Sequence, residues 1–111
     1  MVDFRLNEEQ MMIRDMAREF CDEEVIPNAE EWDKSGTYPL DAIAKAQELG
    51  LLNVTIPEKY GGAGMSTVDE MIICEELSRG DPGFGTASYH TMLASFPILP
   101  GGTEEQKSEY L

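Results

Sequence analysis

The chain has 111 residues, with 22 acidic and 8 basic side chains that give a formal net charge of −14. A field of this sign repels phosphate groups and anionic lipid, so we expect no nucleic-acid partner and no membrane binding through charge. The length fits one domain with its own core, a hydrophobic content of 41% excludes wholesale disorder, and no stretch has the roughly 18 apolar residues of a membrane span.

The cysteines and the amino terminus indicate an intracellular protein. Cys21 and Cys74 lack any metal-ligand spacing, so we expect two reduced thiols packed in the core. The first residues form neither a signal sequence nor a basic transit peptide. We therefore expect a cytoplasmic protein, or one of the mitochondrial matrix if a presequence has been removed.

The first predicted helix begins after Asn7. This residue can cap it, and Gln10 stands where a capping box needs it. The apolar residues of the helix recur at helical spacing and form one stripe: Ile13, Met16, Ala17, Phe20 and Cys21. Because Pro27 disfavours helical geometry in the residue before it, we expect the helix to end near Ile26.

A polar segment over residues 30–37, with a turn at its end, leads to a second predicted helix from Pro39 to Leu49. Gly50 closes that helix in the left-handed conformation. Residues 51–56 are apolar but have no partner strand. We therefore expect an extended or irregular buried step there.

Three glycines, Gly61, Gly62 and Gly64, precede the third predicted helix. They lead into a helix amino terminus, which can hold an anion, but the sequence lacks the Gly-Lys-Ser/Thr ending and the GxGxxG spacing of phosphate loops. We favour the positive φ angles of a tight turn for these glycines, with anion binding as the alternative.

The third predicted helix begins after Ser66, has Asp69 at the capping-box position and ends near Gly80. Its expected apolar face consists of Val68, Met71, Ile72, Ile73 and Leu77. The pattern places the remaining carboxylates of this region on the surface.

Asp81 caps a fourth predicted helix that reaches about Leu93. Beyond it we expect, in order, a helical turn over 96–99, a break over 100–102 and a fifth helix capped by Thr103 with Gln106 at the answering position. The elements together predict an all-α fold. It is a helical bundle of about five helices, with an irregular apolar segment and a glycine-rich turn between helices 2 and 3.

The sequence contains no motif of a catalytic or metal site. His90 is the only histidine, which excludes a multi-histidine metal site, and a nucleophile such as Cys74 or Ser88 lacks the GxSxG elbow. We therefore expect a packed or hydrogen-bonded His90. The acidic groups 22–24 and 30–33 lack the ligand order of a calcium loop and are typical of a solvated surface, so we expect no metal.

Small residues form one face of the fourth predicted helix, at helical spacing: Gly83, Ala87, Thr91 and Ala94. A face of this kind permits close packing between helices. It can also form the wall of a ligand cavity. The residues alone leave both interpretations open.

The passage over residues 57–66, PEKYGGAGMS, followed by Glu70 and Glu75-Glu76-Leu77, resembles the amino-terminal helical domain of the acyl-CoA dehydrogenases. The resemblance covers nearly the whole of residues 1–111 and includes further matching motifs: Val25-Ile26-Pro27, Tyr38-Pro39, Gly50-Leu51-Leu52 and Thr103-Glu104-Glu105-Gln106-Lys107. It implies that the flavin-binding β-domain and the carboxy-terminal domain with the glutamate base lie beyond Leu111.

The same resemblance implies a function. Such enzymes use FAD to convert an acyl-CoA thioester into a trans-2-enoyl-CoA and pass the electrons to an electron-transferring flavoprotein. The resemblance also implies that the full-length protein is a homo-oligomer. The helical domain would shape the acyl pocket. Carried over by position, Thr86, Tyr89 and Leu93 would line it, and the bulk of Tyr89 suggests a shortened pocket.

No catalytic residue falls within this chain on that basis, and FAD would be bound mainly by the other domains. We therefore expect the isolated 111-residue chain to lack dehydrogenase activity. The alternative function is a free-standing helical interaction module without chemistry, which would need a partner to cover its apolar surface.

Overall fold

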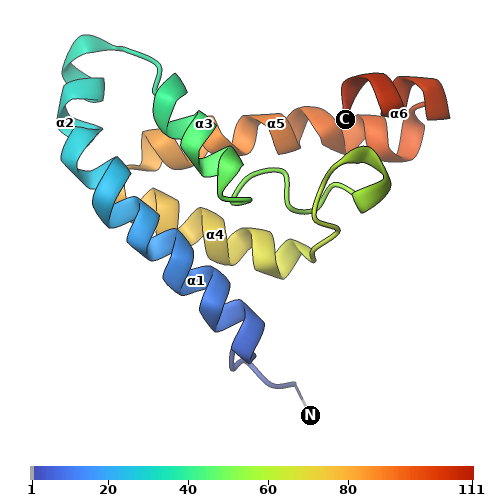
Figure 1. Ribbon diagram of the computed structural model, residues 1–111, viewed down its shortest axis with the longest axis horizontal. Helices are drawn as coiled ribbons and strands as arrows, with labels where there is room; N and C mark the ends of the chain where they lie inside the picture. The colour runs from blue at the N-terminus through green and yellow to red at the C-terminus, as the bar shows by residue number, and fades with distance from the viewer. Residues whose placement is uncertain (1) are drawn as a thin grey trace.

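The computed structural model describes residues 2–111, which form helices and no strand (Figure 1). The helices are, in order, α1 (Glu8–Phe20), a π-helical turn (Cys21–Val25), α2 (Ile26–Ser35), α3 (Leu40–Glu48), a 3₁₀ turn (Glu58–Tyr60), α4 (Thr67–Gly80), α5 (Pro82–Gly101) and α6 (Glu104–Tyr110). Since α1, the π turn and α2 follow one another without a break, the described residues form five helical rods. The predicted all-α bundle is confirmed.

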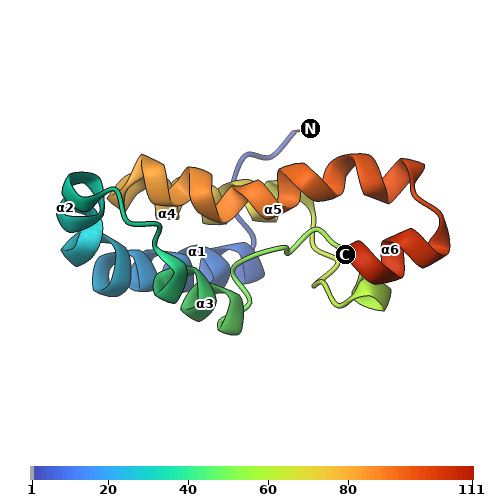
Figure 2. The same cartoon turned by 90° about the horizontal axis from the view of Figure 1, so that it is seen from above.

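The molecule is flat, with extents of 41 × 40 × 21 Å. Figure 2 shows two layers, with α4 and α5 in one and α1 and α3 in the other. The core between them is built on Phe84 of α5, which stacks on Trp32 of α2 at 5.6 Å between ring centres and lies 6.2 Å from Phe20 of α1. Phe84 is 1% exposed, so α5 is held against α1 and α2 through this ring.

The helix starts follow the sequence closely. Capping boxes are present at all three positions where the spacing predicts one, with these pairs: Asn7 and Gln10, Ser66 and Asp69, Thr103 and Gln106. Each pair joins the side chain of the cap to the N–H of the third helical residue, and the side chain of that residue to the N–H of the cap. The amino termini of α1, α4 and α6 are therefore fixed locally.

Pro27 does not end the first helix, and the expected end near Ile26 is wrong. The π turn adds a residue at this point, so the N–H of Ile26 donates to the carbonyl of Cys21, five residues earlier. Pro27 then lies in the first turn of α2, where a missing N–H costs little. The helix continues to Ser35, and only there does the predicted turn occur, at Gly36 with a φ of 67°.

The connection between α3 and α4 matches its prediction. Gly50 ends α3 with a φ of 72°, and residues 51–56 form no strand but bury Leu51, Val54 and Ile56. In the glycine-rich turn, Gly61 and Gly64 have φ values of 91° and 62°. Gly62 does not have the predicted positive φ angle. It is needed for space, because a Cβ there would lie 2.0 Å from the carbonyl oxygen of Ile56.

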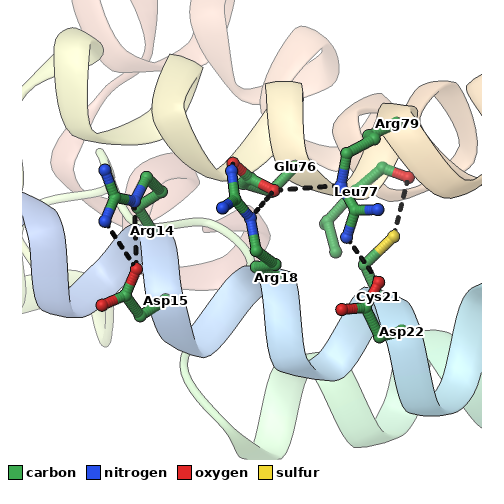
Figure 3. Close-up of polar contacts among 8 residues, drawn as sticks. All are labelled: Arg14, Asp15, Arg18, Cys21, Asp22, Glu76, Leu77 and Arg79. Atoms are coloured by element: carbon green, nitrogen blue, oxygen red, sulfur yellow. Dashed lines mark hydrogen bonds and ion pairs between the residues drawn. The ribbon is translucent and has the colours of Figure 1, made fainter.

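A polar seam joins α1 to α4 (Figure 3). Arg18 of α1 donates to both carboxylate oxygens of Glu76, at 2.7 and 3.0 Å, and Arg79 donates to the same carboxylate at 3.2 Å. Arg79 also reaches back to Asp22 at 2.6 Å. Glu76 is 6% exposed, so the expectation of a surface carboxylate is wrong here. The Arg18 hydrogen bonds hold the pKa of Glu76 below its ordinary value, although burial acts in the other direction.

Glu76→Gln should lower the free energy of unfolding at neutral pH by about 1–2 kcal/mol, because the buried carboxylate loses charge-assisted hydrogen bonds. A lowered pKa in the folded state means that this stability is present above the unfolded pKa and is lost as the pH falls through the folded one. Urea unfolding across pH should therefore show the two proteins converging in acid. Glu75→Gln, at the exposed neighbour, is the control, and equal effects of the two substitutions would contradict the prediction.

Candidate functional site

The fourth predicted helix is the candidate site, and it is longer than expected. Asp81 caps α5, with its carboxylate oxygens accepting from the N–H groups of Gly83 and Phe84, both at 3.1 Å. The helix then runs for 20 residues to Gly101 and contains both Pro97 and Pro100. The predicted end near Leu93 and the separate turn over 96–99 are therefore wrong.

Both prolines are exposed, and this explains the continuity of α5. A proline removes one N–H and crowds the carbonyl four residues earlier, but on an outer face the helix can bend away from that carbonyl. The last part of α5 is also held by α6, which packs against it. Tertiary contacts thus extend the helix past two residues that usually end one.

Close packing between α4 and α5 occurs at Gly85. A Cβ on Gly85 would lie 2.0 Å from the hydroxyl oxygen of Ser78 and 3.0 Å from its Cα, so only glycine fits between the two helices. The buried side of α5 continues along the helix with Phe84, Ser88, Met92 and Ser95. This side, with Gly85, fixes the rotation of α5 about its own axis.

The small-residue face of Gly83, Ala87, Thr91 and Ala94 does not pack against another helix of residues 2–111, because three of these residues are exposed and Ala87 is half-buried. Within the described residues this face therefore has no helix packed on it. The reason is geometric, since Gly85 and Ser88 turn the opposite side of α5 toward α4.

Gly85→Ala should destabilise the protein by about 1–3 kcal/mol, because the new methyl group must push α4 and α5 apart. Gly101→Ala, in the same helix, has no atom within 4 Å of the new Cβ and should be neutral or slightly stabilising. Thermal unfolding of the two variants measures the contrast. A stable Gly85→Ala variant would show that the helices are not in close contact there.

The residues expected to line a pocket lie on the open side of α5. Thr86 and Leu93 are exposed, and Tyr89 is half-buried with its ring 6.3 Å from that of Phe96, edge to face. His90 is exposed on the same helix, and its side chain makes no hydrogen bond to residues 2–111 in the structure, so the expectation of a packed or hydrogen-bonded histidine is wrong.

Charge is absent from α5, although the chain as a whole is strongly acidic. Its 20 residues include no Asp, Glu, Lys or Arg. The hydroxyl group of Thr86 donates to the carbonyl oxygen of Pro82 at 2.9 Å, which satisfies the one polar side chain in the expected set apart from Tyr89. The open side of α5 therefore offers a surface without Asp, Glu, Lys or Arg, which suits an apolar ligand.

No helix of residues 2–111 is long and apolar enough to cross a membrane. Within the same residues, no group of three or more His, Cys, Asp or Glu side chains lies in a position to hold a metal ion. The acidic groups 22–24 and 30–33 are mostly exposed, as their sequence indicates.

A buried carboxylate, Glu70, lies beneath Tyr89, so the expectation of a surface carboxylate is wrong here as well. Glu70 of α4 is 5% exposed, and its nearest polar partner is the hydroxyl group of Thr55 at 3.4 Å. Burial raises the pKa of Glu70, and the pKa of Tyr89 is raised first by burial and then by the charge of Glu70. The helical spacing could have indicated this burial, because Glu70 stands three and seven residues before Ile73 and Leu77 and so lies on the same buried face of α4.

Val68 and Met71 were expected on the buried face of α4, yet they are 58% and 42% exposed. The buried face instead includes Glu70 and Glu76, together with Ile72, Ile73 and Leu77. The prediction from hydrophobicity alone therefore placed the buried face of α4 wrongly by part of a helical turn.

Glu70→Gln should stabilise the protein at neutral pH, because a neutral amide avoids the cost of a buried charge. A raised pKa in the folded state means that stability falls as the pH rises from the unfolded pKa through the folded one. The gain in the free energy of unfolding over the wild-type protein should therefore vanish in acid, below the ordinary carboxyl pKa. At neutral pH this change in stability is opposite in sign to that of Glu76→Gln. Urea unfolding across pH measures both, and a loss of stability in Glu70→Gln at neutral pH would contradict the prediction.

Comparison with known proteins assigns the family. The family model of the acyl-CoA dehydrogenase N-terminal domain matches residues 7–111. A probable mitochondrial medium-chain specific acyl-CoA dehydrogenase from Caenorhabditis briggsae is 44% identical over 99% of this chain, which spans 27% of that protein. The chain therefore belongs to the acyl-CoA dehydrogenase family and matches its N-terminal domain.

Solved structures agree with this assignment. The glutaryl-coenzyme A dehydrogenase complex with glutaryl-CoA matches with a TM-score of 0.92 and 33% identity, over 98% of this chain and 29% of that one. A chain from a structure of the electron transferring flavoprotein of Acidaminococcus fermentans matches with a TM-score of 0.87 and 40% identity, over 99% of this chain and 29% of that one. The chain thus spans less than a third of the length of these relatives.

Proposed function

We propose that residues 1–111 are the amino-terminal helical domain of an FAD-dependent acyl-CoA dehydrogenase and that the open side of α5 forms one wall of its acyl pocket. The observation that carries the proposal is the neutral open side of α5 in a strongly acidic member of this family. An acyl tail is apolar and uncharged, so a helix face without charge can contact it without desolvating an ion.

Thr86, Tyr89 and Leu93 are the contact residues of this proposal. At 100° per residue they fall within one side of the helix. Leu93 supplies apolar area, and Tyr89, braced by Phe96, presents a ring that limits the depth of the pocket. Thr86 has its hydroxyl proton committed to Pro82, so it does not require a polar partner from the ligand.

The contribution of these residues to catalysis is positional. FAD, when bound, would accept the β-hydrogen of the thioester as hydride while a base removes the α-proton, and the product would be a trans-2-enoyl-CoA. Both groups belong to other domains in this proposal, as the resemblance to the family implies. The side chains of α5 would hold the acyl tail and exclude water, which strengthens the electrostatic stabilisation of the enolate.

The wider assignments rest on the relatives. The name of one relative supports a medium-chain acyl-CoA as substrate. The match to a chain from the structure of an electron transferring flavoprotein supports such a flavoprotein as acceptor. A homo-oligomer at full length and a location in the cytoplasm or the mitochondrial matrix complete the proposal. The isolated 111-residue chain should be inactive, and turnover of an acyl-CoA by that chain with added FAD would overturn this part.

Tyr89→Ala in the full-length enzyme should shift kcat/KM toward longer acyl chains, by about 10-fold or more for one or two added methylenes, because the pocket gains depth. Steady-state kinetics across a series of acyl-CoA lengths measures the shift. Thr91→Ala is the matched control, since Thr91 is exposed but lies roughly 200° around the helix from Tyr89. An unchanged length profile in Tyr89→Ala would overturn the role of this residue.

A further inference from the structure

A small cavity lies between residues 51–54, α4 and α5. Its volume is about 20 Å³, and an ordered water molecule needs roughly 10–15 Å³ measured in the same way. The cavity is therefore large enough for one water molecule and too small for an organic ligand. Four of its lining residues have side chains with nitrogen or oxygen atoms that can form hydrogen bonds: Asn53, Glu70, Ser88 and Tyr89.

Asn53 is a lining residue of the cavity and carries an unpaired polar atom. It adopts a left-handed backbone, with a φ of 57°, and its side-chain N–H donates to the Oε1 of Gln47 at 3.1 Å. Its Oδ1 is buried and has no hydrogen-bond partner. Reversing both amides would keep the bond to Gln47 and bury an N–H donor instead, so the buried end of the Asn53 amide lacks a protein partner in either orientation.

Glu70 is a second group with unused hydrogen-bonding capacity. Its carboxyl group is almost fully buried and receives one long hydrogen bond, from Thr55 at 3.4 Å. A carboxyl group has room for about four such bonds. Ser88 does not supply one, because its hydroxyl proton goes to the carbonyl oxygen of Gly85 at 2.9 Å.

We propose that this cavity is a hydration site, in which one ordered water molecule bridges the side-chain amide of Asn53 and the carboxyl group of Glu70. A water molecule has two donors and two acceptors, so it can satisfy both groups whichever way the amide points. A buried polar atom without a partner costs free energy, and the bridge removes that cost for Asn53 while adding a partner for Glu70. The site does not depend on the proposed enzyme function.

A high-resolution crystal structure of the protein tests the site directly. The expected result is one well-ordered water peak within roughly 2.6–3.2 Å of both the Asn53 amide and a Glu70 carboxyl oxygen. An empty cavity would overturn the proposal. A direct hydrogen bond between Asn53 and Glu70 that closes the cavity would overturn it as well.

Substitutions test the same site in solution. Glu70→Leu replaces the carboxyl group by an apolar group of similar size and should remove one long-lived water molecule, counted by oxygen-17 magnetic relaxation dispersion. Glu70→Gln keeps a polar partner and should keep the water. Glu75→Leu, on the exposed side of the same helix, should leave the count unchanged. An unchanged count in Glu70→Leu would overturn the proposal, and the wild-type crystal structure decides if that variant does not fold.

Discussion

The close contact of α5 with α4 at Gly85 is the constraint on which the candidate site depends. A side chain there would overlap Ser78, so the two helices approach only because Gly85 has none. Once that side of α5 faces α4, Phe84 enters the core beneath Trp32, and Thr86 and Leu93 remain exposed. The residues proposed to contact an acyl tail are therefore positioned by a packing contact that their own helix makes through Gly85, on a neighbouring side.

The two buried glutamates of α4 show how environment divides one residue type into two roles. Glu76 receives hydrogen bonds from Arg18 and Arg79, which favour its charged form and join α1 to α4. Glu70 is buried with Thr55 as its one hydrogen-bond partner, and burial favours its neutral form. The first strengthens the scaffold, while the second places a hydrogen-bonding group beneath Tyr89, next to the proposed pocket.

Local sequence signals predicted the local features of this fold and failed where tertiary contacts decide. The capping boxes, the turn glycines and the irregular segment 51–56 depend on residues near one another in sequence, and the structure has them as predicted. Helix continuity at Pro27 and Pro97 depends on a π turn and on solvent exposure, which no local pattern reveals. The burial of Glu70 likewise depends on which side of α4 meets α5.

Membership of the acyl-CoA dehydrogenase family gives the open side of α5 its proposed purpose, and the central claim is that an acyl tail lies against it. A crystal structure of the full-length flavoprotein with a bound acyl-CoA analogue tests this claim most directly. We predict acyl carbons within about 4 Å of Thr86, Tyr89 or Leu93. An acyl chain bound elsewhere, with this side of α5 covered by another part of the protein, would contradict the claim.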